Sequence, residues 1–300
     1  MKRTVLVAGG TGLVGRALIA ALLKTGQKVR VLSTRKGVEV TGAETFYWNP
    51  QDFHMDGQAL DGTDVIVNLA GATVSKKWTT DYKQQIFDSR TRTAETLHRA
   101  LRKMETHTVK AYVSASGVNY YPNSLDGVFV ETDEPGNGYL AQVCQHWELG
   151  ADKFNDTARV VKLRIGAVLS REGGMLEKIE PLAKWGVNSP VGSGEQWLSW
   201  IHIDDLVQLI IHAITKDTVQ GVYNAVSPEP VRNKVFTKQL GQAVKRPVFL
   251  PNVPGFVLKG MLGEMSTIVL EGQNCSSAKI TQTGFTFSHK TLKDALSDLY

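Results

Sequence analysis

The stretch VLVAGGTGLVGRAL, residues 5–18, decides the fold of this 300-residue chain. Its apolar start ends in glycine, which is typical of a strand buried on both faces. Apolar side chains at helical spacing follow from residue 15 onward. Glycines at positions 9, 12 and 15 permit a tight turn and a close approach of backbone to phosphate, and the helix N-terminus offers free N–H groups. We therefore predict a strand–turn–helix that binds the pyrophosphate of a dinucleotide.

The rest of the chain alternates predicted strands with predicted helices. Further strands are predicted at residues 28–33, 43–49, 64–71, 109–116 and 158–169, and the clearest helices at 81–103 and 139–154. Strands that alternate with helices pair in parallel through right-handed crossovers. We predict an α/β protein with a Rossmann doubly wound parallel sheet. A Rossmann domain spans 1–170 with returns near 200–228, and 171–300 form a smaller, mostly helical lobe.

Composition narrows the class of protein. The charged content is 21%, and the net charge of +5 comes from Lys and Arg that are scattered along the chain. This distribution does not indicate a nucleic-acid partner. Two distant cysteines indicate a reducing compartment. No stretch approaches the length that spans a bilayer, and no His, Cys, Asp and Glu set has metal-ligand spacing. We expect a cytoplasmic protein without a membrane partner or a metal.

The end of the second predicted strand distinguishes the two common dinucleotides. An NAD site usually has an acid there, which binds the adenosine ribose. Here the sequence is VLSTRK, residues 31–36, and it offers Ser33, Thr34 and Arg35 instead. Hydroxyls and a guanidinium suit a 2′-phosphate, so NADP(H) is favoured over NAD. The alternative interpretation is a solvated basic turn.

With the glycine turn joined to NLAG, residues 68–71, the chain resembles the extended short-chain dehydrogenase/reductase superfamily, which includes sugar-nucleotide epimerases and dehydratases. Residues 71–97, GVNYYP at 117–122, WIHIDDL at 200–206 and residues 255–273 are similar to its atypical branch, the epimerase family proteins. The resemblance runs nearly end to end. It implies an NADP-binding Rossmann domain followed by a short C-terminal domain.

The resemblance also implies which residues contact the cofactor. It assigns Gly9, Thr11, Gly12, Leu13 and Val14 to the phosphate turn, Ser33, Thr34 and Arg35 to the adenosine phosphate, and Leu69 and Ala70 to the ribose, with Gln85, Arg90 and Val168 as further contacts. Without the resemblance, Arg90 on a helix would be interpreted as a surface charge.

The expected catalytic pattern is incomplete. Enzymes of the superfamily use a Ser or Thr and a Tyr-x-x-x-Lys, because a phenol of pKa near 10 needs a neighbouring cation to work at pH 7. Ser116 ends a predicted strand in the expected place. In YLAQVCQHWE, residues 139–148, the lysine position falls on Val143 or on Cys144, depending on the alignment. We predict Ser116 and Tyr120 as the catalytic residues; Tyr121 is the alternative phenol, although paired tyrosines are more often packing.

Several other residues have two interpretations. Cys144 is a potential nucleophile, but a buried structural thiol is favoured. His202 is favoured as structural, with Asp204 or Asp205 as a helix cap. Three tryptophans either line a substrate cleft or join the lobes as core aromatics, namely Trp185, Trp197 and Trp200.

Two functions follow from these observations. The first is an NADP-dependent oxidoreductase or epimerase-like enzyme that acts on a small polar or sugar-like substrate between the sheet edge and the smaller lobe. The second is an NADPH-binding sensor or scaffold without turnover, which the missing lysine favours. A homodimer through the helices at 81–103 and 139–154 is expected from the superfamily.

Overall fold

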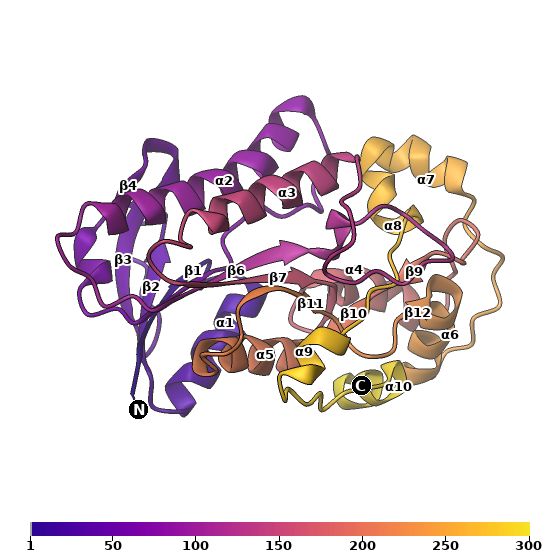
Figure 1. The fold of residues 1–300 in the computed structure, drawn as a ribbon. Helices are drawn as coiled ribbons and strands as arrows, with labels where there is room; N and C mark the ends of the chain where they lie inside the picture. The colour runs from indigo at the N-terminus through magenta and orange to yellow at the C-terminus, as the bar shows by residue number, and fades with distance from the viewer. Residues whose placement is uncertain (1) are drawn as a thin grey trace.

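An eight-stranded sheet forms the centre of the computed structural model, which describes residues 2–300 (Figure 1). The spatial order is β11-β7-β6-β5-β1-β2-β3-β4. All neighbours pair in parallel except β4, which is antiparallel to β3. The bounds are β1 (Thr4–Ala8), β2 (Lys28–Ser33), β3 (Glu44–Asn49), β4 (His54–Met55), β5 (Val65–Asn68), β6 (Ala111–Gly117), β7 (Arg159–Ile165) and β11 (Gly221–Ala225). The predicted Rossmann fold is confirmed.

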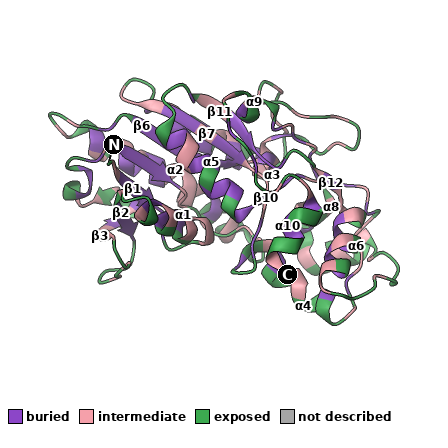
Figure 2. Cartoon of the chain, turned by 90° about the horizontal axis from the view of Figure 1, so that it is seen from below, coloured by how far each residue is buried: buried purple, intermediate pink, exposed green. Residues whose placement is uncertain are grey.

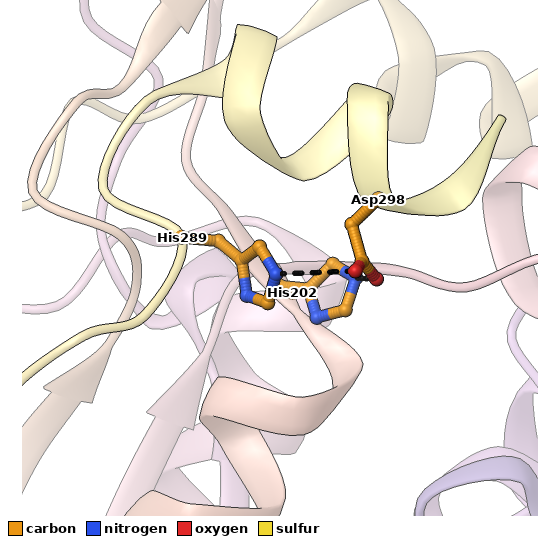
Figure 3. Close-up of side chains that lie close together, drawn as sticks. All are labelled: His202, His289 and Asp298. Atoms are coloured by element: carbon orange, nitrogen blue, oxygen red, sulfur yellow. Dashed lines mark ion pairs between the residues drawn. The ribbon is translucent and has the colours of Figure 1, made fainter.

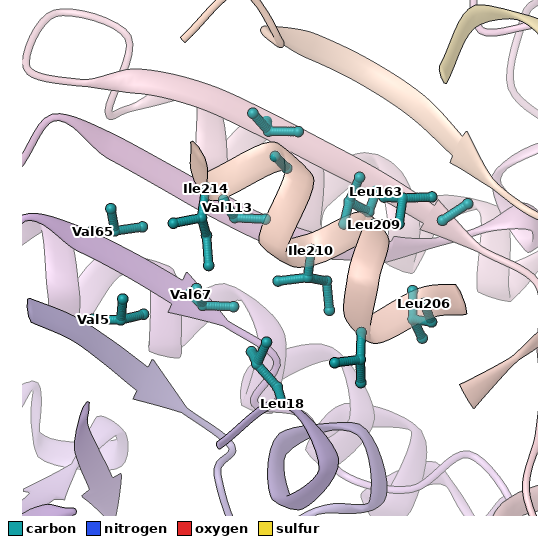
Figure 4. Close-up of a cluster of buried hydrophobic side chains, with 14 of the residues drawn as sticks. Val5, Leu18, Val65, Val67, Val113, Leu163, Leu206, Leu209, Ile210 and Ile214 are labelled. Atoms are coloured by element: carbon teal, nitrogen blue, oxygen red, sulfur yellow. The ribbon is translucent and has the colours of Figure 1, made fainter. Parts of the chain in front are cut away.

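Helices cover both faces of the sheet. Helices α1 (Leu13–Lys24) and α5 (Ile203–Thr215) cover one face, and α2 (Thr80–Arg102) and α3 (Tyr139–Asp152) cover the other (Figure 1). Because side chains alternate along a strand, Val5 and Val7 of β1 lie in the core under α1 and α5, whereas Leu6 and Ala8 lie in the core under α2 and α3. Figure 4 shows the core under α1 and α5, in which apolar side chains of α5 lie together with Leu18 of α1 and with side chains of β1, β5, β6 and β7. The homodimer expected through α2 and α3 stays a prediction.

The strand expected over residues 158–169 is instead two strands. β7 ends at Ile165, and β8 (Ala167–Leu169) pairs in parallel with β10 (Trp200–His202) outside the main sheet. The break is at Gly166, where a Cβ would lie 2.5 Å from the carbonyl oxygen of Ser199. The chain therefore bends where another backbone segment crosses it, a contact that strand periodicity does not encode.

The smaller lobe is mostly helical, as predicted. It contains α4 (Gly174–Lys184), β9 (Trp197–Leu198), β12 (Val231–Arg232), α6 (Asn233–Ala243), α7 (Gly255–Leu262), α8 (Thr267–Leu270) and α10 (Leu292–Leu299). Short 3₁₀ helices occur in both regions: η1 (Pro50–Asp52), η2 (Gly57–Leu60) and η3 (Val118–Tyr120) in the Rossmann domain, and η4 (Gly263–Ser266) in the smaller lobe. Trp200, fully buried, lies in the core of this lobe.

The chain also returns to the sheet at α9 (Ala278–Gln282), beside β11. Ile280, Phe285 and Phe287 are buried in the same core as α1 and α5. This third return was not expected from the sequence. Figure 2 shows the buried strands in purple beneath helices whose outer faces are exposed. Among residues 2–300, no helix is long and apolar enough to cross a membrane.

The turn between β1 and α1 has no room for side chains at two of its glycines. Gly9 has a φ of +83°, and a Cβ on it would lie 2.7 Å from the carbonyl carbon of Leu69. A Cβ on Gly15, in the first turn of α1, would overlap the carbonyl oxygen of Gly9. Glycine at these positions therefore allows the helix to pack directly on the turn that precedes it.

We predict that Gly15→Ala destabilises the protein by about 1–3 kcal/mol, because the added methyl group has to push the helix off the turn. Urea unfolding measures the change. Gly260→Ala is the matched control, since Gly260 is also helical and a Cβ there meets no atom within 4 Å. The control should be neutral or stabilising by up to about 1 kcal/mol. Equal effects of the two substitutions would contradict the packing argument.

Candidate functional site

The order of the strands places one crevice at the carboxyl edge of the sheet. The chain leaves β1 and β5, which are neighbours, toward opposite faces, and this is the switch point where ligands of open α/β sheets bind. The two segments that leave them touch, since the Leu69 N–H donates to the Ala8 carbonyl at 2.9 Å. The predicted residues Gly9, Leu69 and Ala70 therefore lie together.

The N-terminus of α1 faces this crevice without a cap. Its N-cap residue is Gly12, so no side chain accepts from the first N–H groups, and no acid lies in the first turn. Thr11 and Gly12 are exposed, while Leu13 and Val14 are half-buried. The orphan N–H groups and the positive end of the helix dipole suit an anion such as a pyrophosphate.

Val168 lies on the other side of the same helix start. Its carbonyl oxygen lies 3.5 Å from the Cβ position of Gly174, and that position is also 3.4 Å from a methyl group of Leu13. The starts of α1 and α4 and the strand β8 thus converge. Sequence reasoning placed Val168 only through the family resemblance, because no local pattern relates residues 13 and 168.

The end of β2 carries the expected donors and no carboxylate. Ser33 is buried, and its hydroxyl accepts from the Arg35 N–H at 3.1 Å and donates to the Arg35 carbonyl at 2.9 Å. This arrangement fixes the turn and leaves Thr34 and Arg35 exposed. Arg35 forms no ion pair with any residue between 2 and 300.

Arg90 lies against the segment after β5 rather than on the outer surface of α2. Its Nη1 donates to the carbonyls of Ala72 at 3.1 Å and Ile86 at 3.0 Å, and its guanidinium lies 4.8 Å from the ring centroid of Trp147. Burial lowers the pKa of Arg90. No carboxylate of the described chain pairs with it. Gln85 is exposed on the same helix, and its side chain makes no hydrogen bond with the residues described.

Behind this crevice, a buried polar network connects four elements. Ser116 Oγ donates to Glu148 Oε1 at 2.8 Å, and Arg164 forms two bonds with the Glu148 carboxylate, of 2.8 and 3.0 Å. Arg164 also donates to the Tyr121 hydroxyl, which donates to Asn224 Oδ1, both at 2.8 Å. All five side chains are buried. The ion pair orients Ser116 and was missed, because nothing local relates Glu148 to a residue 16 positions away.

Arg164 lies beside two phenols, Tyr120 and Tyr121, but burial outweighs the effect of its charge on their pKa values. The ring of Tyr120 lies against the Arg164 guanidinium, 3.4 Å from its centroid, yet burial raises the pKa of Tyr120. The Tyr139 hydroxyl donates to the Lys83 carbonyl at 2.6 Å, and burial raises the pKa of Tyr139 to about 12. Burial likewise raises the pKa of Cys144 to about 11, which agrees with a structural thiol. The roles of Ser116 and Tyr120 stay predictions.

His202 itself caps α5, and neither of the expected aspartates does. Its Nδ1 accepts from the Asp204 N–H at 3.2 Å. Asp205 instead accepts from the N–H groups of Ser288 and His289, at 2.7 and 2.9 Å. The His202 imidazole thus accepts the hydrogen bond from the first turn of α5 that an aspartate was expected to accept. Asp205 instead holds the segment before α10.

Three titratable side chains meet where the start of α5 lies beside α10: His202, His289 and Asp298 (Figure 3). The two imidazole rings stack with centroids 3.8 Å apart, and His202 Nε2 lies 3.4 Å from Asp298 Oδ2. Although three potential ligands lie close together, the cap requires that His202 carry its proton on Nε2. That tautomer has no lone pair at Nε2 for a metal, and Nε2 makes no hydrogen bond within the described chain, so the cluster connects α5 to α10 through ring contact and the nearby Asp298 carboxylate.

The three tryptophans have separate surroundings. Trp200 is a core residue and donates to the Glu229 carbonyl at 2.8 Å. Trp197 stacks on Arg232, 3.8 Å from ring centroid to guanidinium carbon. Trp185 is 85% exposed at the end of α4. For Trp200 the core interpretation is confirmed, whereas Trp185 is too exposed to be a core aromatic.

Comparisons with known proteins agree with this geometry. Residues 5–225 match the model of the NAD dependent epimerase/dehydratase family, and 253–299 match a domain of unknown function, DUF1731. An Arabidopsis thaliana protein, the chloroplastic homolog of epimerase family protein SDR39U1, is 38% identical over 98% of this chain and 86% of its own. An epimerase family protein of Mycobacterium leprae is 36% identical over 99% and 95%.

Solved structures give the same result. The human epimerase family protein SDR39U1, crystallised with NADPH, is 31% identical, with a TM-score of 0.89 over 99% of this chain and 98% of that one. A nucleoside-diphosphate sugar epimerase of Corynebacterium glutamicum is 30% identical, with a TM-score of 0.80 over 100% and 58%.

We predict that Glu148→Leu destabilises the protein by about 3–5 kcal/mol, because it leaves the Arg164 guanidinium buried without a counter-charge. Arg164→Met should cost a similar amount for the converse reason. The double variant should be more stable than the sum of the two changes implies, since neither charge is then buried alone. Urea unfolding of all four proteins measures the coupling. Strictly additive changes would mean that the two charges do not interact.

Proposed function

Because the chain belongs to the NAD dependent epimerase/dehydratase family, we propose that it binds NADP(H) in the crevice between β1 and β5 and reduces or epimerises a small polar or sugar-like substrate. One observation carries the proposal: an uncapped, glycine-lined helix N-terminus lies at the switch point of the sheet. The NADPH in the human relative supports the choice of cofactor.

The residues around the crevice fit such a cofactor. The N–H groups at the start of α1 would hold the pyrophosphate, and the Arg90 guanidinium, which has no carboxylate partner among residues 2–300, would approach ribose or phosphate oxygens. Ser33, Thr34 and Arg35 would hold a 2′-phosphate, for which an acid at the end of β2 would be repulsive. NADPH, when bound, supplies a hydride.

The protonation state of Tyr120 limits what this side chain could do with a substrate. Burial raises its pKa, so the phenol stays protonated at neutral pH and would orient a substrate oxygen by donating a hydrogen bond rather than remove a proton. The buried Glu148–Arg164 pair would hold Ser116, which ends β6 at the same edge of the sheet. The chain's own contribution to catalysis would then be orientation of the substrate through hydrogen bonds.

A sensor or scaffold that binds NADPH without turnover is the second candidate. This candidate is favoured by Cys144, a buried thiol at one of the two positions with which the superfamily's lysine could align. A thiol lacks the positive charge by which that lysine would lower the pKa of a phenol and hold the nicotinamide ribose.

We predict that the protein transfers deuterium from stereospecifically labelled NADPH to at least one member of a panel of carbonyl compounds and sugar nucleotides, as mass spectrometry detects. Ser116→Ala should reduce the transfer, whereas Ser124→Ala, in a surface loop, should not. An absence of transfer to every compound, from protein that binds NADPH, would favour the sensor.

We also predict that NADPH binds more tightly than NADH and that Arg90→Ala weakens NADPH binding by about one to two orders of magnitude. Hydrogen bonds to charged groups contribute roughly 1.5–3 kcal/mol, and each 1.4 kcal/mol is about tenfold in affinity. Titration calorimetry measures both effects. Lys103→Ala, just beyond the far end of α2, is the control and should bind like the parent. If both variants bind alike, Arg90 makes no contact with the cofactor.

A further inference from the structure

Helix α7 is apolar and yet covers no core. Its sequence is GFVLKGML, and none of its eight residues is buried. Phe256 is 77% exposed and Met261 is 73% exposed. A helix of this composition normally packs an apolar face against the rest of the protein. The face of α7 is therefore available to something outside the described chain.

A second apolar site lies at the end of α4. Trp185 and Phe249, which is 72% exposed, line a hollow of about 630 Å³ together with Lys184, Gly186, Arg246 and Pro247. Trp185, Phe249, Phe256 and Met261 are the four most exposed large apolar side chains of residues 2–300. The segment from α6 to α7 connects the two sites along the edge of the lobe (Figure 1). We call these four side chains, with Arg246 and Lys259, the apolar-basic face.

The segment from α6 to α7 carries charge of one sign. Residues 233–262 contain five cations, Lys234, Lys238, Lys245, Arg246 and Lys259, and no Asp or Glu. Lys234 pairs with Glu195, whereas the other four form no ion pair with the chain that the structure describes. All four are exposed. The protruding apolar side chains thus stand beside four cations that form no ion pair with the described chain, although Glu264 and Glu271 follow α7 and Glu271 lines a hollow with Phe256 and Lys259.

We propose that the apolar-basic face docks this protein peripherally on an anionic phospholipid surface. Lys and Arg near such a surface are attracted to its lipid headgroups, and Trp and Phe enter the boundary between headgroups and acyl chains. The apolar side chains come from separate elements and stand out singly. A fluid lipid phase accommodates them in that arrangement, whereas a folded partner would need matching pockets. The sequence expectation of no membrane partner rested on spanning segments, which do not bear on peripheral docking.

Vesicle flotation of the whole protein tests the proposal. Vesicles of phosphatidylcholine mixed equally with phosphatidylglycerol should carry the protein, vesicles of phosphatidylcholine alone should not, and added salt should release it. Trp185 is the one strongly exposed tryptophan, so its fluorescence should shift to the blue on binding. Trp185→Phe should abolish that shift while the protein still floats.

Substitutions assign the binding to this face. Lys245→Glu with Arg246→Glu should weaken vesicle binding by at least about tenfold, as should Trp185→Ser with Phe249→Ser. Lys103→Glu and Leu149→Ser are the matched controls, being an exposed cation and a 60% exposed leucine on the α2 and α3 side. All variants should melt like the parent and still bind NADPH, which separates this proposal from the function proposed above.

Four results would overturn the proposal. One is equal flotation with neutral and anionic vesicles, and another is loss of binding in the controls as much as in the face variants. The third is a concentration-dependent dimer that the Trp185→Ser/Phe249→Ser variant abolishes, which would show that a second copy of the chain covers the face. Capture of an acidic protein without vesicle binding would likewise contradict the docking on lipid.

Discussion

The backbone contact between the turn after β1 and the first turn of α1 sets the rest of the architecture. At Gly15 the helix lies so close to the Gly9 carbonyl that a single methyl group would separate them. The same turn touches the segment leaving β5, which fixes the switch point of the sheet. The part of the crevice at the start of α1 is thus made of backbone, and its polarity comes from N–H groups rather than from side chains.

Local patterns in the sequence predicted the parts of the structure that local physics determines. Apolar runs predicted the central strands, helical spacing predicted α2 and α3 to within a few residues, and the glycine spacing predicted the turn. Contacts between distant residues could not be predicted in this way. The Glu148–Arg164 pair, the cap by His202 and the crossing of Ser199 at Gly166 depend on which surfaces meet after folding.

The candidate site combines a well-formed place for a cofactor with an unusual environment for proton transfer. The position of the superfamily's lysine falls on a buried thiol or a valine. A buried ion pair, Glu148–Arg164, instead orients Ser116 and Tyr121. Buried pairs of this kind cost as much desolvation as they return, so their benefit is in geometry rather than in stability.

The return of α9 and the following residues to the sheet has a consequence for how the protein can be divided. Ile280, Phe285 and Phe287 complete the core under β11, so the chain enters the smaller lobe and comes back before it ends. A cut made after residue 170 would leave that core without its last apolar layer, and shortening the C-terminus would do the same. The two regions are interlocked in sequence, so we expect them to unfold as one cooperative unit.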